Sequence, residues 1–261
     1  MSTAPARPTA GTTVPAAAQT LSVLSYLARQ PRPVAAATLA RELQLARSTV
    51  YALLATLIEH GFVVHLADDR RFALGLSAYE LSSGYARQAP LQRLARLPLA
   101  DLVDGTGESA HLAVLHGREV VYVIEERAAG RPPLVTDVGV RLPAALTASG
   151  RAMLSALPPA QVRALFPDAS AFVQRTDTGP RTLTELRRLL TEVRRTGMAW
   201  EDGEVTSGLS SVAVAVLDPT GYPVAAVAST YPADGSGVAA GGHYPAVART
   251  AAEVTRRLRG S

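Results

Sequence analysis

The side chains that could carry covalent chemistry are few in this chain, and their spacing does not suit it. Cysteine is absent, which excludes thiol nucleophiles, disulfides and Cys-based metal sites. The 5 histidines form no His-x-x-x-His pair, and no carboxylates accompany them at the spacing of a metal site. The segment 207–211 contains serines but lacks the Gly-x-Ser-x-Gly pattern that places a nucleophile on a sharp turn. We therefore expect no catalytic residue, no metal, no cofactor and no enzymatic function.

Three other polar features have simpler explanations. The acidic groups 125–126 and 201–204 are interpreted as charged surface loops. The glycine-rich stretch 233–242 lacks the Lys and the Ser/Thr of a phosphate-binding loop, so we interpret it as a flexible loop. His111 and His116 are five residues apart and face opposite sides of an ideal strand.

Binding to the phosphates and base edges of DNA fits residues 47–60 better. Apolar residues recur there at the spacing of one helix face, which predicts a helix over 48–60 with an inward face of Val50, Leu53, Leu54, Leu57 and Ile58. Arg47, Ser48 and Thr49 lie at the helix N-terminus, where backbone N–H groups favour phosphate, and Ser48 could cap the helix. The outward face comprises Tyr51, Ala52, Ala55 and Thr56. A helix that enters the major groove needs one apolar face that packs against its own domain and one polar face that contacts the base edges.

The elements around this helix complete a recognisable module. Two helices are predicted before it, over 20–29 and 36–43, and two strands after it, over 62–66 and 72–74. The turn 67–71 joins the strands and places Arg70 and Arg71 at a hairpin tip, where they could contact phosphate or the minor groove. Three helices followed by a hairpin describe a winged helix-turn-helix.

The chain after residue 90 is predicted to contain both helices and strands. Helices are predicted over 91–103, 147–157, 182–196 and 246–259, and strands over 109–116, 119–125, 212–217 and 224–230. The fold class predicted is therefore α+β with two domains, the second an α/β sensor-like domain.

Composition sets the predicted boundaries and compartment. We expect a disordered leader over 1–18, the winged helix-turn-helix over 19–76, a linker helix over 77–90 and the second domain over 91–259. The net charge of +4 is carried mostly by residues 1–90, with eight arginines against five acids. That bias favours nucleic acid only weakly. No apolar run reaches the length of a membrane span, so we predict a cytoplasmic protein with no membrane partner.

Several ordered motifs carry a resemblance to a known family. Residues 38–43, 46–54, 60–62 and 71–75 resemble the DNA-binding domain of the IclR-type bacterial transcriptional regulators. Residues 141–152 and 197–213 are similar to the two signatures of the same family's downstream domain. The resemblance covers roughly residues 20–258 in the same order. It implies a winged helix followed by a GAF-like domain that binds a small effector.

The resemblance also implies sites. The DNA-binding residues it assigns, with those from the helix pattern, are Thr38, Arg47, Ser48, Thr49, Tyr51, Ala52, Thr56, Arg70 and Arg71. The effector-binding residues carried over by position are Ala148, Ser149, Glu201, Ser211, Ala228 and Thr230. The family often has Arg at Ala52, Asp at Glu201, Cys at Ser211 and Ser at Ala228, so neither the operator nor the effector can be taken over from relatives.

The function predicted is an effector-modulated transcriptional regulator, by default a repressor. Its expected partners are double-stranded DNA with a pseudo-palindromic operator, a small organic effector, and a second copy of the chain. The resemblance implies dimers through the DNA-binding domain and tetramers through the sensing domains. The alternative, suggested by Ala52 on the reading face, is a ligand-sensing protein-interaction module without DNA binding.

Overall fold

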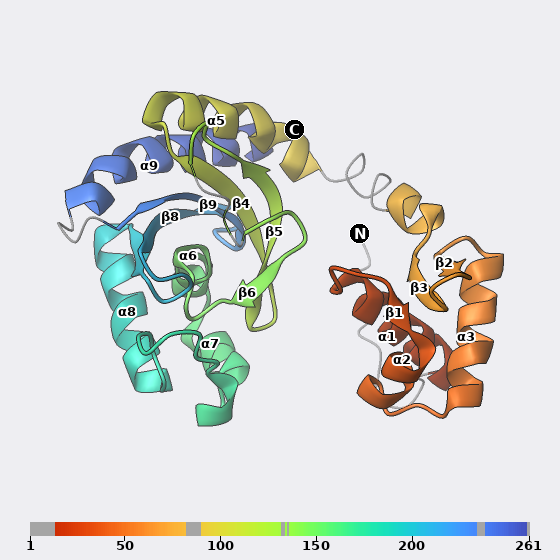
Figure 1. Ribbon diagram of the computed structural model, residues 1–261. Helices are drawn as coiled ribbons and strands as arrows, with labels where there is room; N and C mark the ends of the chain where they lie inside the picture. Colours follow the sequence, from red (N-terminus) through yellow and green to blue (C-terminus); the bar gives the residue numbers. More distant parts are fainter. Residues whose placement is uncertain (1–13, 82–89, 132–133, 135, 234–237, 260–261) are drawn as a thin grey trace, which may run out of the picture. The chain divides into compact units, whose positions relative to one another are not determined.

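The computed structural model describes residues 14–81, 90–131, 134, 136–233 and 238–259. The chain forms two compact units that divide after residue 88 (Figure 1). No helix in these ranges is both long enough and apolar enough to span a bilayer.

The first unit contains three helices and a small antiparallel sheet. Its elements are α1 (Pro15–Ala28), β1 (Val34–Ala35), α2 (Ala36–Glu42), α3 (Arg47–Glu59), β2 (Val63–Leu66) and β3 (Arg71–Leu74), followed by helical residues 76–81. The strand order is β1-β3-β2. Leu39, Leu54 and Phe72 belong to one buried core that joins the helices to the sheet. This is the predicted winged helix.

Four details of this unit differ from the prediction. Helix α1 begins at Pro15 rather than residue 20, because Pro fits the first turn and Ala16–Ala18 favour a helix; the predicted leader over 1–18 therefore overlaps it. Ser48 is not the cap of α3, since the helix begins at Arg47 after Ala46. Ile58 is 39% exposed rather than inward. Strand β1 was not predicted, because two residues show no periodicity.

Two glycines fix the way the hairpin leaves α3. Gly61 has φ +71°, a left-handed conformation that ends the helix. A Cβ on Gly75 would lie 2.2 Å from the carbonyl oxygen of Gly61. The two backbone segments can pack this closely only because residue 75 has no side chain.

The second unit is built on one antiparallel sheet with helices on both faces (Figure 1). Its strands are β4 (Ser109–His116), β5 (Glu119–Glu126), β6 (Arg141–Pro143), β7 (Ala199–Asp202), β8 (Leu209–Leu217) and β9 (Pro223–Pro232), in the order β6-β5-β4-β9-β8-β7. Its helices are α5 (Pro90–Thr106), α6 (Ala148–Ala156), α7 (Pro159–Leu165), α8 (Leu183–Thr196) and α9 (Val238–Arg259), with a 3₁₀ turn at Ala169–Ala171.

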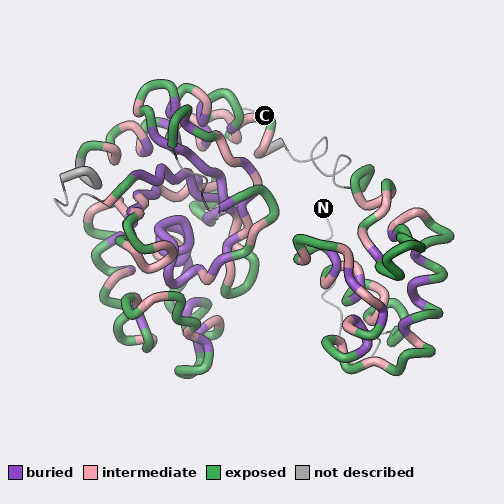
Figure 2. Tube along the Cα trace, viewed as in Figure 1, coloured by how far each residue is buried: buried purple, intermediate pink, exposed green. Residues whose placement is uncertain are grey.

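The sheet separates two buried cores (Figure 2). Helices α5 and α9 pack together on one face, where Leu112, Val227 and Val254 are buried. Helices α6 and α8 lie on the other face, and the sheet curls around α6. The predicted α/β domain is therefore a curled sheet with α6 on the concave side.

The C-terminal helix is longer than predicted. We expected it to begin at residue 246, after a flexible loop over 233–242. Helix α9 instead begins at Val238 and includes Gly241 and Gly242, while 234–237 lie outside the described residues. Packing of α9 against α5 and β8 outweighs the low helix propensity of glycine.

Candidate DNA-binding helix and ligand cavity

Helix α3 presents a polar face opposite its buried one. Val50, Leu53, Leu54 and Leu57 are buried. Arg47, Ser48, Tyr51, Ala52 and Thr56 are exposed, and Thr49 is half-buried. The helix has no side-chain cap, so its first N–H groups are available to an incoming phosphate. The structure thus places the predicted reading residues on one accessible surface.

The remaining predicted DNA contacts differ in placement. Thr38 lies half-buried within α2. Arg70 is exposed in the hairpin turn with φ +50°. Arg71 is the first residue of β3, and its Nη1 donates to the carbonyl oxygen of Pro33 at 3.0 Å. Arg70 is therefore the wing-tip side chain, whereas Arg71 also ties β3 to the chain before β1.

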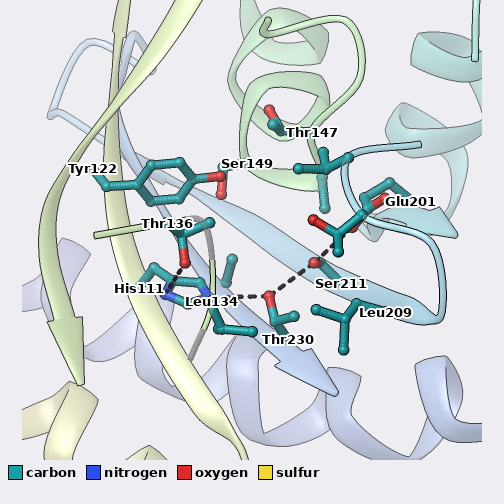
Figure 3. A pocket seen from close by; sticks show the side chains of 14 residues that line it. His111, Tyr122, Leu134, Thr136, Thr147, Ser149, Glu201, Leu209, Ser211 and Thr230 are labelled. Atoms are coloured by element: carbon teal, nitrogen blue, oxygen red, sulfur yellow. Dashed lines mark hydrogen bonds between the residues drawn. The ribbon is translucent and has the colours of Figure 1, made fainter. Parts of the chain in front are cut away.

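A small pocket lies on the concave face of the second unit (Figure 3); the space between its lining atoms, open solvent included, is about 390 Å³. It is bounded by strands of the sheet, the N-terminal end of α6 and the loop between β7 and β8. Its lining residues are His111, Tyr122, Leu134, Thr136, Thr147, Ala148, Ser149, Glu201, Val205, Thr206, Leu209, Ser211, Ala228 and Thr230. All six predicted effector-binding residues are brought together here, although they come from four separate elements.

The start of α6 forms one wall of the cavity. Thr147 precedes the helix, and its Oγ1 accepts a hydrogen bond from the N–H of Gly150 at 3.0 Å. A Cβ on Gly150 would lie 2.1 Å from the carbonyl oxygen of Ala144, so only glycine lets the helix pack this closely. The cap leaves the first N–H groups, those of Ala148 and Ser149, directed beyond the helix end. This wall can accept an oxygen-rich group of a ligand.

A chain of hydrogen-bonded side chains crosses the opposite wall (Figure 3). Glu201, Ser211 and Thr230 lie side by side on β7, β8 and β9. Ser211 Oγ donates to Glu201 Oε1 at 2.8 Å, and the hydroxyl oxygens of Ser211 and Thr230 are 2.8 Å apart. Thr230 Oγ1 is 3.0 Å from His111 Nε2, and Thr136 Oγ1 is 3.5 Å from His111 Nδ1. The chain joins two of the titratable groups of the cavity, Glu201 and His111.

Burial changes the ionisation of these groups. The pKa of Glu201 is raised to about 7, mainly by burial and also by the nearby Glu204 carboxylate, against the lowering effects of the hydrogen bond from Ser211 and the charge of Arg151. Burial lowers the pKa of His111 to about 4, so its imidazole is neutral at neutral pH. Burial also raises the pKa of the Tyr122 hydroxyl. The cavity therefore contains a neutral His and Tyr and a carboxyl group that exchanges its proton near neutral pH.

Arg151 is buried behind the cavity and holds its walls together. Its Nε donates to the carbonyl oxygen of Ala145 at 2.9 Å, and its Nη1 donates to that of Trp200 at 2.7 Å. Its Nη2 pairs with Glu204 Oε1 at 2.7 Å. Glu204 in turn donates its N–H to Glu201 Oε2 at 3.2 Å. One guanidinium thus connects α6, β7 and the loop over 203–208.

The structure corrects the interpretation of both acidic groups as charged surface loops. In the group 201–204, Glu201 is 3% exposed and the Glu204 side chain 13%. The group 125–126 ends strand β5, and the Glu125 side chain is 3% exposed. His111, Tyr122 and Thr136 were not predicted as cavity residues. The register of β4 and β9, which places His111 opposite Ala228, identifies His111 once the strands are paired. Thr136 lies in a segment without regular structure and has no such signal.

Two family models match the chain. The IclR helix-turn-helix domain matches residues 16–67, and the model described as bacterial transcriptional regulator IclR C-terminal matches residues 83–236. The first match lies in the first unit, and the second covers the second unit as far as residue 236.

Individual proteins are similar over most of the length. The glycerol operon regulatory protein of Streptomyces coelicolor is 31% identical over 209 residues, which are 80% of this chain and 81% of that protein. The transcriptional repressor IclR of Escherichia coli is 26% identical over 216 residues, 81% of this chain and 78% of that one. An IclR homolog from Microbacterium hydrocarbonoxydans, solved in complex with 4-hydroxybenzoate, has the same fold, with a TM-score of 0.80, 21% identity and coverage of 94% of this chain and 100% of that one. The matched families and these relatives are regulators, not enzymes.

Proposed function

The chain belongs to the IclR family of bacterial transcriptional regulators, and on this premise we propose that it is a homodimeric repressor whose binding to a pseudo-palindromic operator is altered by a small organic molecule in the cavity of the second unit. The observation that carries the proposal is the combination, in one chain, of an exposed polar face on α3 and a partly polar pocket on the concave face of the sheet. Polar groups at fixed positions among apolar side chains are typical of small-ligand sites.

The DNA contacts proposed divide by chemistry. We propose that Arg47, Ser48 and Thr49 bind phosphate at the N-terminus of α3 and that Tyr51 and Thr56 contact base edges; all but the half-buried Thr49 are exposed. Ala52 can contribute only an apolar contact, for example with a thymine methyl group. Arg70 would add a phosphate or minor-groove contact from the hairpin turn.

A dimer follows from the size of the reading helix, which covers only a few base pairs. The first unit also exposes apolar side chains outside the reading face. Leu21 is 63% exposed, Leu76 69%, Tyr79 69% and Leu81 66%. These side chains could be covered by a second copy. We propose dimerisation through this unit, with action on DNA in the cytoplasm and tetramer formation through the second unit as a further step.

Repression is proposed because the E. coli relative is named a repressor. The ligand can change operator binding only if it binds the DNA-competent and DNA-free arrangements with different affinity. The aromatic carboxylate of the Microbacterium homolog serves as a first probe of ligand class.

Fluorescence anisotropy with the intergenic DNA that flanks the gene tests the proposal. Wild-type affinity should fall steeply with salt, with a log–log slope of about −0.9 per phosphate contact. The double variant Arg47→Ala, Thr49→Ala should bind more weakly and, in a dimer, have a slope shallower by about 2. Arg188→Ala removes an exposed arginine on α8 and should change neither quantity.

A ligand-sensing interaction module without DNA binding is the second candidate, favoured by the exposed Ala52 where the family often has Arg. It predicts no sequence-preferring binding at any salt concentration. It also predicts that the double variant and Arg188→Ala behave alike.

A further inference from the structure

The cavity described above has no cation among its described lining residues. Its titratable side chains are His111, Tyr122 and Glu201. Arg151, which lies behind the wall, is fully engaged with the carbonyl oxygens of Ala145 and Trp200 and with Glu204. An anionic ligand would therefore lie beside the buried Glu201 carboxylate, and no described lining residue would supply a positive charge. Two like charges in a buried site are strongly unfavourable.

Other features of the same cavity nevertheless suit an acceptor group. The hydroxyls of Tyr122 and Ser149 have no hydrogen-bond partner within the described part of the chain, and both residues are more than nine-tenths buried. Figure 3 shows the Tyr122 hydroxyl pointing toward the Ser149 side of the cavity. The first N–H groups of α6 lie at the same wall. Several donors without acceptors indicate a place for the oxygens of a carboxylate.

The hydrogen-bond chain shows how the conflict of charge is resolved. With Glu201 ionised, Ser211 donates to Glu201, Thr230 to Ser211, and His111 Nε2–H to Thr230. Every proton of the chain then points toward Glu201, and none is left for a ligand. A protonated Glu201 is itself a donor and no longer requires the Ser211 proton.

We propose that the cavity takes up a small organic carboxylate together with one proton, which Glu201 holds while the ligand is bound. The proton comes from solvent and returns to it when the ligand leaves. This inference rests on the proposed function, since it concerns the ligand of the same site. The expected ligand is a monoanion. The proton taken up with it removes the negative charge of Glu201, so the site needs no positively charged side chain to pair with the ligand.

The groups that face Glu201 from each neighbouring element support this assignment. Glu204 in the following loop raises the pKa of Glu201, and Arg151 on α6 lowers it from behind the wall. His111 on β4 stays neutral because burial lowers its pKa to about 4. The pKa of Glu201 is about 7, so the proton is available near neutral pH.

The first measurement follows the Glu201 carboxyl group by ¹³C NMR in the full chain, with Glu201→Gln to assign its signal. We expect titration near pH 7, and a higher pKa when acetate, benzoate or 4-hydroxybenzoate is added. A Glu201 signal that titrates at the ordinary value for a glutamate would overturn the proposal. So would the failure of all three probes to raise its pKa.

The second measurement is calorimetric titration with whichever probe binds, in buffers of different ionisation enthalpy. Uptake of close to one proton at pH 8 is expected, and affinity should fall about 30-fold between pH 6 and 8.5, where the probe is ionised throughout. Glu201→Gln should remove that pH dependence, whereas Glu201→Asp, which keeps a carboxyl group, should retain it. Glu192→Gln is the matched control, because it makes the same change at an exposed position on α8.

Binding of a probe without proton uptake would overturn the inference. Operator binding in the absence of probe separates this result from failure of the proposed function. If the wild-type chain still binds its operator with salt dependence, the regulator proposal stands while the proton-linked ligand is rejected.

Discussion

Replacement of Arg151 by Met should destabilise the second unit severely. The Arg151 side chain is 2% exposed and binds two backbone carbonyl oxygens and Glu204. Met keeps the length of the aliphatic stem but leaves the carboxylate of Glu204 and both carbonyls without their partner. Removal of one member of a buried ion pair typically costs about 3–5 kcal/mol. With a urea m-value near 2 kcal/mol per M, the unfolding midpoint should fall by about 2 M.

The chain contains a convenient reporter for this experiment. Trp200 is the only tryptophan, and its own carbonyl accepts from Arg151, so fluorescence follows unfolding of the second unit alone. The control is Arg195→Met on α8, whose pair with Glu192 is 71% and 50% exposed. A surface pair of this kind contributes about 0–1 kcal/mol. If the free energy of unfolding fell by less than about 1 kcal/mol in both variants, the Arg151 network would not hold the cavity walls together and the reasoning would be refuted.

Three further predictions concern titration, backbone contact and assembly. Glu201 has a pKa of about 7 in the fold against an ordinary 4.5, so it makes stability fall as pH rises between these values, whereas His111, at about 4 against 6.5, makes stability rise with pH. The two effects oppose each other in the wild-type chain. Measured by urea unfolding, the free energy of unfolding should rise with pH in Glu201→Gln and fall with pH in His111→Gln, by roughly 3 kcal/mol in each case across the titration range. The same pH dependence in both variants would contradict the assignment. Gly75→Ala should destabilise the first unit by about 1–3 kcal/mol and weaken operator binding, because the new Cβ meets the Gly61 backbone. Gly105→Ala on α5, with open space around the new methyl group, should be neutral or stabilising in thermal unfolding by circular dichroism. Tyr79→Ser with Leu81→Ser should shift sedimentation toward monomer, whereas Leu97→Ser, equally exposed on the second unit, should not; the reverse result would move the dimer interface to that unit.

Local sequence signals were enough to predict most helices and strands. The apolar face of α3 and the strand-forming runs 109–116 and 119–125 predict elements that the structure contains at nearly the same positions. The differences arise where tertiary contacts decide. Strand β1 exists because two residues pair with β3, and α9 extends through glycines because it packs on α5 and the sheet.

The ligand cavity was less predictable from the residues themselves. Ser211 and Thr230 were assigned to it by resemblance, but the pattern of the sequence does not say which face of a strand meets the cavity. The bulge between Leu112 and Ala113, and the register that sets His111 beside Ala228, become visible only once β4 is paired on both sides. The burial of Glu201 and Glu204 was misread for the same reason, since Arg151, which pairs with Glu204, lies 53 residues earlier in the chain.

Alanine forms the floor of the cavity at a point where three strands meet. Ala228 is 2% exposed and lies in register between His111 on β4 and Ala213 on β8. A methyl side chain at the centre of a rigid sheet can be enlarged one or two atoms at a time without moving the strand. Each such substitution would make the cavity smaller and change the shape of its floor. Helix α3 lies in a separate unit and would keep its preference for the same DNA sequence. The architecture therefore lets a lineage acquire a response to a different metabolite by point substitution and keep control of the same genes.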